Sequence, residues 1–177
     1  MKKYILVGII VCIFIGVLPL NAQDYSKDTE TIESTMEAVL DVISGPAGRK
    51  MDMARFRNLF RGDIKFHIRT KRNDQLTIAE LSVESYISNV APRLEGQDFF
   101  ETLGSLTVDR YGDIAQIFMV YETRRSPDGE PFDKGINSFQ LMYDQGRWWV
   151  VGLMWQAESS GVPIPKKYLK SKNSKKK

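Results

Sequence analysis

The amino-acid sequence predicts one α+β domain, in which three helices from the N-terminal half pack against a mainly antiparallel sheet. Before residue 92, apolar side chains recur in three stretches at the spacing of a helix face. After residue 97, apolar and polar side chains alternate, as they do along strands. Residues 147–156 are apolar on both faces, which predicts a central strand that is covered on both sides.

The first 22 residues have the pattern of a secretory signal peptide. Two lysines precede an apolar run from Tyr4 to Leu18, Pro19 follows the run, and Ala22 offers a small residue for cleavage. We expect an exported protein whose mature chain begins near Gln23 and has no membrane span. The alternative is an uncleaved anchor, although the apolar run is shorter than the about 20 residues of a spanning helix.

The charge is unevenly distributed along the chain. The net charge of +3 includes seven lysines in residues 166–177, whereas residues 23–165 hold 16 basic and 22 acidic residues. Because a nucleic-acid-binding domain places its basic residues on the fold, the acidic body argues against that class. We expect a domain at 23–169 and a basic, disordered tail at 170–177, with weak attraction to an anionic membrane as the alternative role of the tail.

The residues that usually bind metals are scarce. Cys12, the single cysteine, lies in the predicted signal peptide, and the acidic residues lack the spacing of a calcium loop. His67 is the single histidine and shares a predicted strand face with Lys65 and Arg69. We therefore expect no metal and no cofactor, and a His67 that faces solvent, with a pocket base as the alternative.

The first helix is predicted over residues 28–44. Asp28 suits the N-cap, because its carboxylate can accept a hydrogen bond from the first helical turn. Gly45 and Pro46 stop the helix, since glycine adopts the left-handed cap conformation readily. Its apolar stripe consists of Ile32, Met36, Val39, Leu40 and Ile43.

Two shorter helices are predicted at residues 52–60 and 83–91. Each has apolar side chains along one face only. Ser82 can cap the second of them, and Pro92 is expected to end it, because the residue before a proline disfavours the helical conformation.

Strands are predicted where apolar and polar side chains alternate. They span residues 64–69, 97–108, 114–123, 135–143 and 147–156, with a short extended piece at 75–78. The last two strands are joined at Asp144, Gln145 and Gly146, where Asp and Gly tolerate the positive φ of a tight turn. Regular alternation places one set of apolar side chains of the last strand on the same face: Trp149, Val151, Leu153 and Trp155.

Several short motifs together resemble one superfamily. They are ISGPAG at residues 43–48, GINS at 135–138 followed by Gln140 and Leu141, and RWWV at 147–150. The chain resembles the nuclear transport factor 2-like superfamily, which includes SnoaL-like polyketide cyclases and ketosteroid isomerases, and more closely an exported bacterial subgroup of it. The resemblance covers residues 29–169 and implies a cone-shaped α+β fold, with a curved sheet wrapped on helices around a cavity. It carries over no catalytic residue.

Four residues are predicted to line such a cavity: Glu101, Tyr121, Asn137 and Trp155. Glu101 lies between Phe99 and Leu103 on a face that we expect to be buried, where a carboxylate would have a raised pKa and could act as a base. The alternatives are a Glu101 paired with an arginine, a Tyr121 buried in the core, and a Trp155 in the core or at a dimer surface. A bulge within 97–108 would turn every residue beyond it to the other face.

Three functions fit these observations. The first is an exported, non-catalytic domain, periplasmic or secreted, that binds a small apolar molecule in the cone. The second is a cofactor-independent isomerase, dehydratase or cyclase that uses acid–base chemistry in the cavity. The third is a protein-interaction domain whose cavity is filled by side chains. A homodimer through the outer sheet face is also expected, because the apolar second face of residues 147–156 needs a cover.

Overall fold

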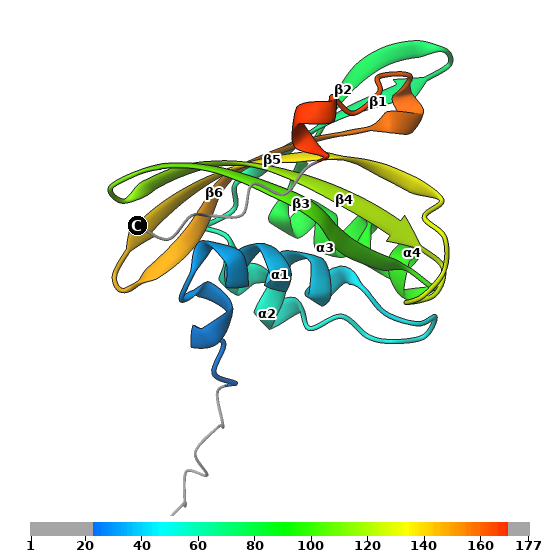
Figure 1. Ribbon diagram of the computed structural model, residues 1–177. Helices are drawn as coiled ribbons and strands as arrows, with labels where there is room; N and C mark the ends of the chain where they lie inside the picture. The colour runs from blue at the N-terminus through cyan, green and yellow to red at the C-terminus, as the bar shows by residue number, and fades with distance from the viewer. Residues whose placement is uncertain (1–22, 170–177) are drawn as a thin grey trace, which may run out of the picture.

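The computed structural model describes residues 23–169 as a six-stranded sheet with helices against one of its faces (Figure 1). The helices are α1 (Ile32–Ile43), α2 (Met53–Leu59), α3 (Val83–Asn89) and α4 (Ala91–Glu95), and the 3-10 turns are η1 (Ser26–Thr29), η2 (Glu158–Ser160) and η3 (Lys166–Tyr168). The strands are β1 (Lys65–Arg72), β2 (Gln75–Ser82), β3 (Phe100–Tyr111), β4 (Ile114–Arg124), β5 (Asp133–Asp144) and β6 (Arg147–Ala157). The predicted α+β class is confirmed. We call the sheet face toward the helices the inner face and the opposite one the outer face.

The strand β6 lies inside the sheet, as its two apolar faces predicted. The strand order is β2-β1-β6-β5-β4-β3, and β1–β6 is the parallel pair among otherwise antiparallel neighbours. The turn between β5 and β6 holds two residues, Gln145 at φ 52° and Gly146 at φ 83°. Positive φ therefore falls on Gln145 rather than on Asp144, which stays in the ladder opposite Arg147.

A bulge in β6 corrects the predicted faces of this strand. Gln140 pairs with Gly152 and Leu141 pairs with Val150, so that Val151 is an extra residue in β6. The extra residue reverses the alternation. Trp148 and Val150 are consequently buried with Leu153, whereas the predicted face had grouped Trp149 and Val151 with Leu153.

The hydrophobic core lies between the helices and the inner face. Its largest fully buried side chains include Met36 and Leu59 from the helices and Phe66, Ile117 and Phe139 from the strands. These residues are at most 1% exposed. Helices that each carry one apolar stripe can cover only one face of the sheet, which is the arrangement in Figure 1.

The N-cap of helix α1 lies three residues later than predicted. Thr31 is its N-cap and accepts a hydrogen bond from the Ser34 N–H at 3.0 Å, while the Ser34 hydroxyl accepts one from the Thr31 N–H at 3.1 Å. This reciprocal pair satisfies two N–H groups that the helix leaves free. Asp28, the predicted N-cap, lies one turn earlier, in η1.

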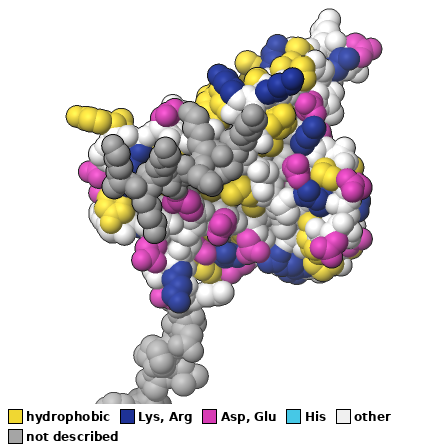
Figure 2. Space-filling view, viewed as in Figure 1, with side chains coloured by type: hydrophobic (Ala, Val, Ile, Leu, Met, Phe, Trp, Pro, Cys, Tyr) yellow, Lys and Arg dark blue, Asp and Glu magenta, His cyan; other side chains and the backbone are white. Residues whose placement is uncertain are grey.

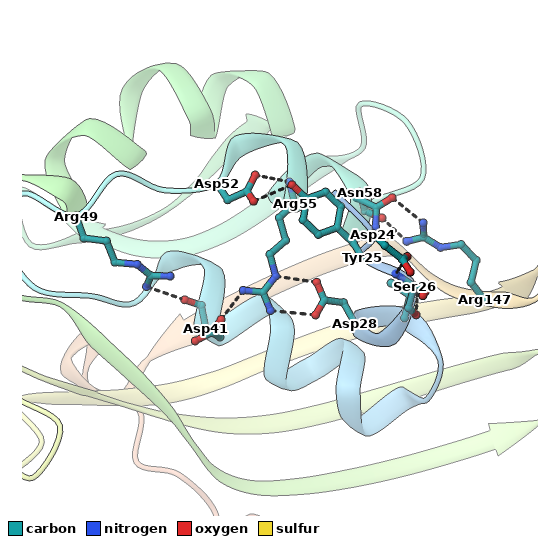
Figure 3. Close-up of polar contacts among 11 residues, drawn as sticks. Asp24, Tyr25, Ser26, Asp28, Asp41, Arg49, Asp52, Arg55, Asn58 and Arg147 are labelled. Carbon is teal, nitrogen blue, oxygen red and sulfur yellow. Dashed lines mark hydrogen bonds and ion pairs between the residues drawn. The ribbon is translucent and has the colours of Figure 1, made fainter. Parts of the chain in front are cut away.

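Asp28 instead takes part in an ion-pair network that holds η1 against α1 and α2 (Figure 3). The Arg55 guanidinium donates to Asp28 through Nε at 2.7 Å and through Nη2 at 3.0 Å, and it also pairs with Asp41. The Tyr25 hydroxyl donates to Asp52 at 2.7 Å. The first described residues are thus fastened to the helical layer by side chains from three elements.

The β1–β2 hairpin and the helix α4 differ from the sequence prediction. The strand β2 extends to Ser82 and pairs with β1 along its whole length, whereas only a short piece at 75–78 was expected. The hairpin turn has positive φ at Asn73 and Asp74. Pro92 does not end the helical region, because it lies in the first turn of α4, where a missing N–H costs nothing.

The C-terminal segment covers part of the outer face. Ile164 is 8% exposed, the Tyr168 ring stacks on Phe118 with 5.2 Å between centroids, and the Ser105 hydroxyl donates to the Tyr168 carbonyl. In Figure 1 these turns lie on the side of the sheet opposite to the helices, beside the projecting β1–β2 hairpin. Figure 2 shows hydrophobic side chains together with basic ones in that region.

The predicted signal peptide at 1–22 and the predicted tail at 170–177 lie outside the described residues. Within residues 23–169, no helix is long and apolar enough to cross a bilayer.

Candidate functional site

A cavity of about 250 Å³ lies between the inner sheet face and the helices. Its walls come from α1, α2, α3, α4 and five strands, as a sheet curved over a helical layer requires. Nine of its lining residues are aromatic: Phe56, Phe60, Phe66, Tyr86, Phe99, Tyr121, Phe132, Phe139 and Trp155. All four residues predicted from the sequence, Glu101, Tyr121, Asn137 and Trp155, line this one cavity. The structure thus brings them together, and their role as ligand contacts stays a prediction.

Glu101 reaches the cavity from β3, opposite Thr123 of β4. Its backbone N–H donates to the Ser44 hydroxyl at 2.9 Å, and that hydroxyl donates to the Leu40 carbonyl at 2.6 Å. Ser44 therefore ties the end of α1 to the start of β3. The Ser44 hydrogen bonds therefore fix the position of the Glu101 backbone relative to α1.

A bulge in β3 lies between Leu103 and Ser105, beyond Glu101. Leu103 pairs with Tyr121 and Ser105 with Val120, which leaves Gly104 as the extra residue. Leu103 was expected on the buried face but is 39% exposed. Since the bulge lies beyond Glu101, the alternation that places Glu101 on the inner face is intact.

The Glu101 carboxyl group is held in surroundings that disfavour its ionised form. Burial among protein atoms raises its pKa to about 7, the Asn137 side chain partly offsets this rise, and the Asp133 carboxylate adds to it. The residue keeps some accessible surface because the cavity opens onto it. Of the ion pairs within residues 23–169, none involves Glu101, so the alternative of an arginine partner is not realised.

Tyr121 and Asn137 lie on the neighbouring strands β4 and β5. Tyr121 is 6% exposed and Asn137 is 7% exposed. The Tyr121 ring lies over Gly135, where a Cβ would come within 2.5 Å of the Tyr121 hydroxyl. Glycine at 135 thus makes room for the ring. Burial raises the pKa of Tyr121, and the nearby Glu101 carboxylate raises it further, so this phenol is a neutral hydrogen-bond donor.

Trp155 closes the cavity from β6. It lies opposite Asn137 of β5 and Ile68 of β1, and its ring is 6.3 Å from that of Phe66. The cavity is therefore bounded on this side by aromatic carbon.

Sequence reasoning missed three polar residues of the cavity: Tyr86, Thr123 and Asp133. Tyr86 lies in the helix predicted at residues 83–91, and burial together with the Glu101 carboxylate raises its pKa. Asp133 precedes the stretch that was recognised as a strand. It shares the alternation of Gly135 and Asn137, and this spacing was the signal that could have placed it on the inner face.

His67 lies away from this cavity. It belongs to β1, its side chain is 43% exposed, and its Nε2 is 3.7 Å from Glu80. The structure places it in a groove on the outer face with Met154 and Ile78. Among residues 23–169, no three His, Cys, Asp or Glu side chains are grouped as metal ligands would be.

Comparisons with known proteins identify the fold. No family model matches the sequence, and no curated protein matches it. A nuclear transport factor 2-like protein of unknown function from Pseudomonas putida superposes with a TM-score of 0.50 at 17% identity, over 79% of this chain and 87% of the other. A protein of unknown function with a cystatin-like fold from Nostoc punctiforme gives 0.54 at 13% identity, over 73% and 95%.

A putative calcium/calmodulin-dependent kinase II association domain from Exiguobacterium sibiricum gives a TM-score of 0.51 at 11% identity, over 76% of this chain and 92% of that one. These similarities show that the chain has the nuclear transport factor 2-like fold, which the sequence motifs had predicted. The exported subgroup that those motifs suggested stays a prediction.

Proposed function

We propose that the protein binds one small, mainly apolar molecule in the cone cavity, with the polar end of that molecule toward Glu101, Tyr121 and Asn137. The observation that carries this proposal is the cavity of about 250 Å³, whose aromatic walls meet polar side chains at one wall. Ligand sites in proteins typically have this composition. Because an apolar cavity of about 150 Å³ accepts benzene, the volume suits a molecule of about one or two rings.

The cavity volume argues against the third function expected from the sequence. A protein-interaction domain with a filled cone would have its core packed to the density of other protein interiors, without a void of this size. The open volume therefore favours a ligand over side chains as the content of the cone.

Acid–base catalysis is the second candidate, and one observation favours it. A carboxylate whose pKa is about 7 can both accept and return a proton near neutral pH, as an isomerase, dehydratase or cyclase requires. Tyr86 and Tyr121 could donate hydrogen bonds to an oxygen on which negative charge develops. In this function Glu101 is the base and no cofactor takes part.

Export and pairing of subunits belong to the same proposal. The apolar run and Ala22 of the N-terminal segment support export to the periplasm or the medium. Exposed apolar side chains on the outer face, Ile114 at 54% and Met142 at 41%, support a homodimer through that face.

The binding proposal can be tested by ligand-observed NMR with naphthalene and 2-naphthol as probes. Val90 lines the cavity and is half-buried, so Val90→Trp should fill the cavity and abolish binding. Val162, which is 50% exposed on the outer face, provides the matched control Val162→Trp, which should bind as the wild type does. Equal binding by both variants, or no binding by the wild type, would contradict the proposal.

A further inference from the structure

The cavity has an unbalanced charge. Two carboxylates line it, Glu101 and Asp133, while its described lining contains no lysine, arginine or histidine. Glu101 on β3 and Asp133 on β5 both pair with Thr123 of β4. The two acids thus lie on either side of one buried threonine, with their Cα atoms about 10 Å apart, two strand spacings.

Among residues 23–169, no basic side chain forms an ion pair with Glu101 or Asp133. Asp133 accepts a hydrogen bond from the Lys134 backbone N–H at 3.0 Å, and within residues 23–169 it forms no ion pair. The Arg125 guanidinium lies over the ring of the lining residue Phe132, at 4.3 Å, and donates to Gln97 at 2.8 Å. Its charge is thus directed at the rim and not at the carboxylates.

The remaining walls suit a positive charge as well. Tyr86 and Phe56 stack with ring centroids 5.0 Å apart on the helical side, and Trp155 and Tyr121 line the sheet side. Aromatic faces attract cations through their negative π-clouds, and this attraction grows where water is excluded. An anionic ligand would meet two carboxylates in the same space and would be repelled.

We infer that the ligand of the cone cavity is a protonated amine with a compact apolar body, whose ammonium group lies between Glu101 and Asp133. This inference rests on the proposed function, because it names the chemical class of the molecule that the cavity binds. The ammonium group of the ligand supplies a positive charge to a wall whose described lining has two carboxylates and no basic side chain. The apolar body of the ligand contacts the aromatic side chains.

Isothermal titration calorimetry with matched probes tests this inference. The probes are 2-phenylethylamine, 2-phenylethanol and phenylacetate, which share one ring, together with the naphthyl analogues of all three. The amine should bind at least about tenfold more tightly than the alcohol, and the carboxylate should bind most weakly. Glu101→Gln and Asp133→Asn should each remove most of the preference for the amine over the alcohol.

The control for charge is Glu130→Gln, which removes one negative charge from the exposed turn between β4 and β5. This variant should keep the full preference for the amine, because long-range attraction through water is screened. A preference lost equally in all three variants would show that net charge, and not the cavity, attracts the amine, and would overturn the inference.

The outcomes separate the inference from the proposed function. If the alcohols bind at least as tightly as the amines, the cavity is a site for neutral molecules and only the amine assignment falls. If no probe of either ring size binds in any form, the proposed function falls with it. Amine affinity should also rise with pH up to about 7, because Glu101 holds its proton below that pH and carries no charge to attract the ammonium group. The titratable groups that face the ammonium group are Glu101, Asp133, Tyr86 and Tyr121.

Discussion

Glu101 shows how the neighbours of one carboxyl group decide its chemistry. Its strand carries it to the inner face, where it meets Asn137, Tyr121 and a second acid, Asp133. Because aromatic carbon replaces water on most sides, the neutral acid is favoured and the pKa rises to about 7. At neutral pH this group is therefore only partly ionised, which suits both a proton acceptor and a partner for a cationic ligand.

The raised pKa makes a prediction about stability. Between its ordinary value of 4.5 and about 7, Glu101 keeps its proton in the folded chain and loses it in the unfolded chain, so ionisation lowers the unfolding free energy as pH rises. The Glu101→Gln variant has no carboxyl group at this position, so its unfolding free energy does not fall with pH for this reason. Relative to wild type, the variant should gain as much as about 3 kcal/mol of unfolding free energy between about pH 4 and about pH 8.

Urea denaturation at the two pH values measures this gain, with the exposed Glu130→Gln as a control that should show almost none. If Glu101→Gln instead loses a few kcal/mol at about pH 8, the carboxylate is part of a buried ion pair, and its place in the site is wrong.

Two bulges mark the limit of what strand alternation could predict. The inner-face positions of Glu101, Asn137 and Trp155 follow from a period of two residues, and the structure agrees. The bulge at Val151 shifts this period by one, so Val151 was placed on the wrong face, and the bulge at Gly104 shifts the period for the part of β3 that follows it. A bulge depends on the partner strand, which a single strand's sequence does not reveal, and glycine at 104 was its one local signal.

In the helical layer too, the sequence pattern predicted the elements but not the contacts between them. Apolar periodicity located α1, α2 and α3, because each buries one stripe on the sheet. It did not reveal that Asp28 serves as the partner of Arg55 and not as a cap, since that contact joins residues 27 apart in the sequence. Contacts between distant elements, including Tyr86 with the Glu101 site, needed the three-dimensional structure.

The helix α2 allows a direct comparison of two arginines. Arg55 side-chain exposure is 21%, and it pairs with Asp28 and Asp41, whereas Arg57 is 48% exposed and pairs with Glu84. Arg55→Met should lower the unfolding free energy by about 2–3 kcal/mol, because the Asp28 carboxylate, whose side chain is 18% exposed, loses its partner. Arg57→Met should cost less than about 1 kcal/mol, as exposed ion pairs do.

Chemical denaturation of the two variants under the same buffer measures the difference. Equal costs would show that the network in Figure 3 does not fasten η1 to the helices more firmly than an exposed ion pair would.

The whole molecule has two apolar surfaces on its sheet, and only one is fully covered. Helices cover the inner face, while the C-terminal segment with Ile164 and Tyr168 covers one part of the outer face. The remaining part exposes Ile114 and Met142 beside Val151, around a shallow groove. A symmetric contact between two copies would bury this area, as two-fold interfaces do.

The proposed dimer predicts a change of mass in solution. Met142→Glu places a charge in the apolar contact and should convert a dimer at micromolar concentration into a monomer. Leu76→Glu is the matched control, since Leu76 is 42% exposed near the tip of the β1–β2 hairpin, and it should leave the dimer intact. Light scattering that finds wild-type monomer at this concentration would contradict the interface.

The central claim is that the cone holds a small molecule, and native mass spectrometry of the protein purified from its own host tests it most directly. We predict a species heavier than the chain by the mass of one compound of about one or two rings. This species should disappear in Val90→Trp, which fills the cavity, and persist in the surface control Val162→Trp. A wild-type spectrum with the bare chain alone, under conditions that preserve non-covalent complexes, would contradict the account.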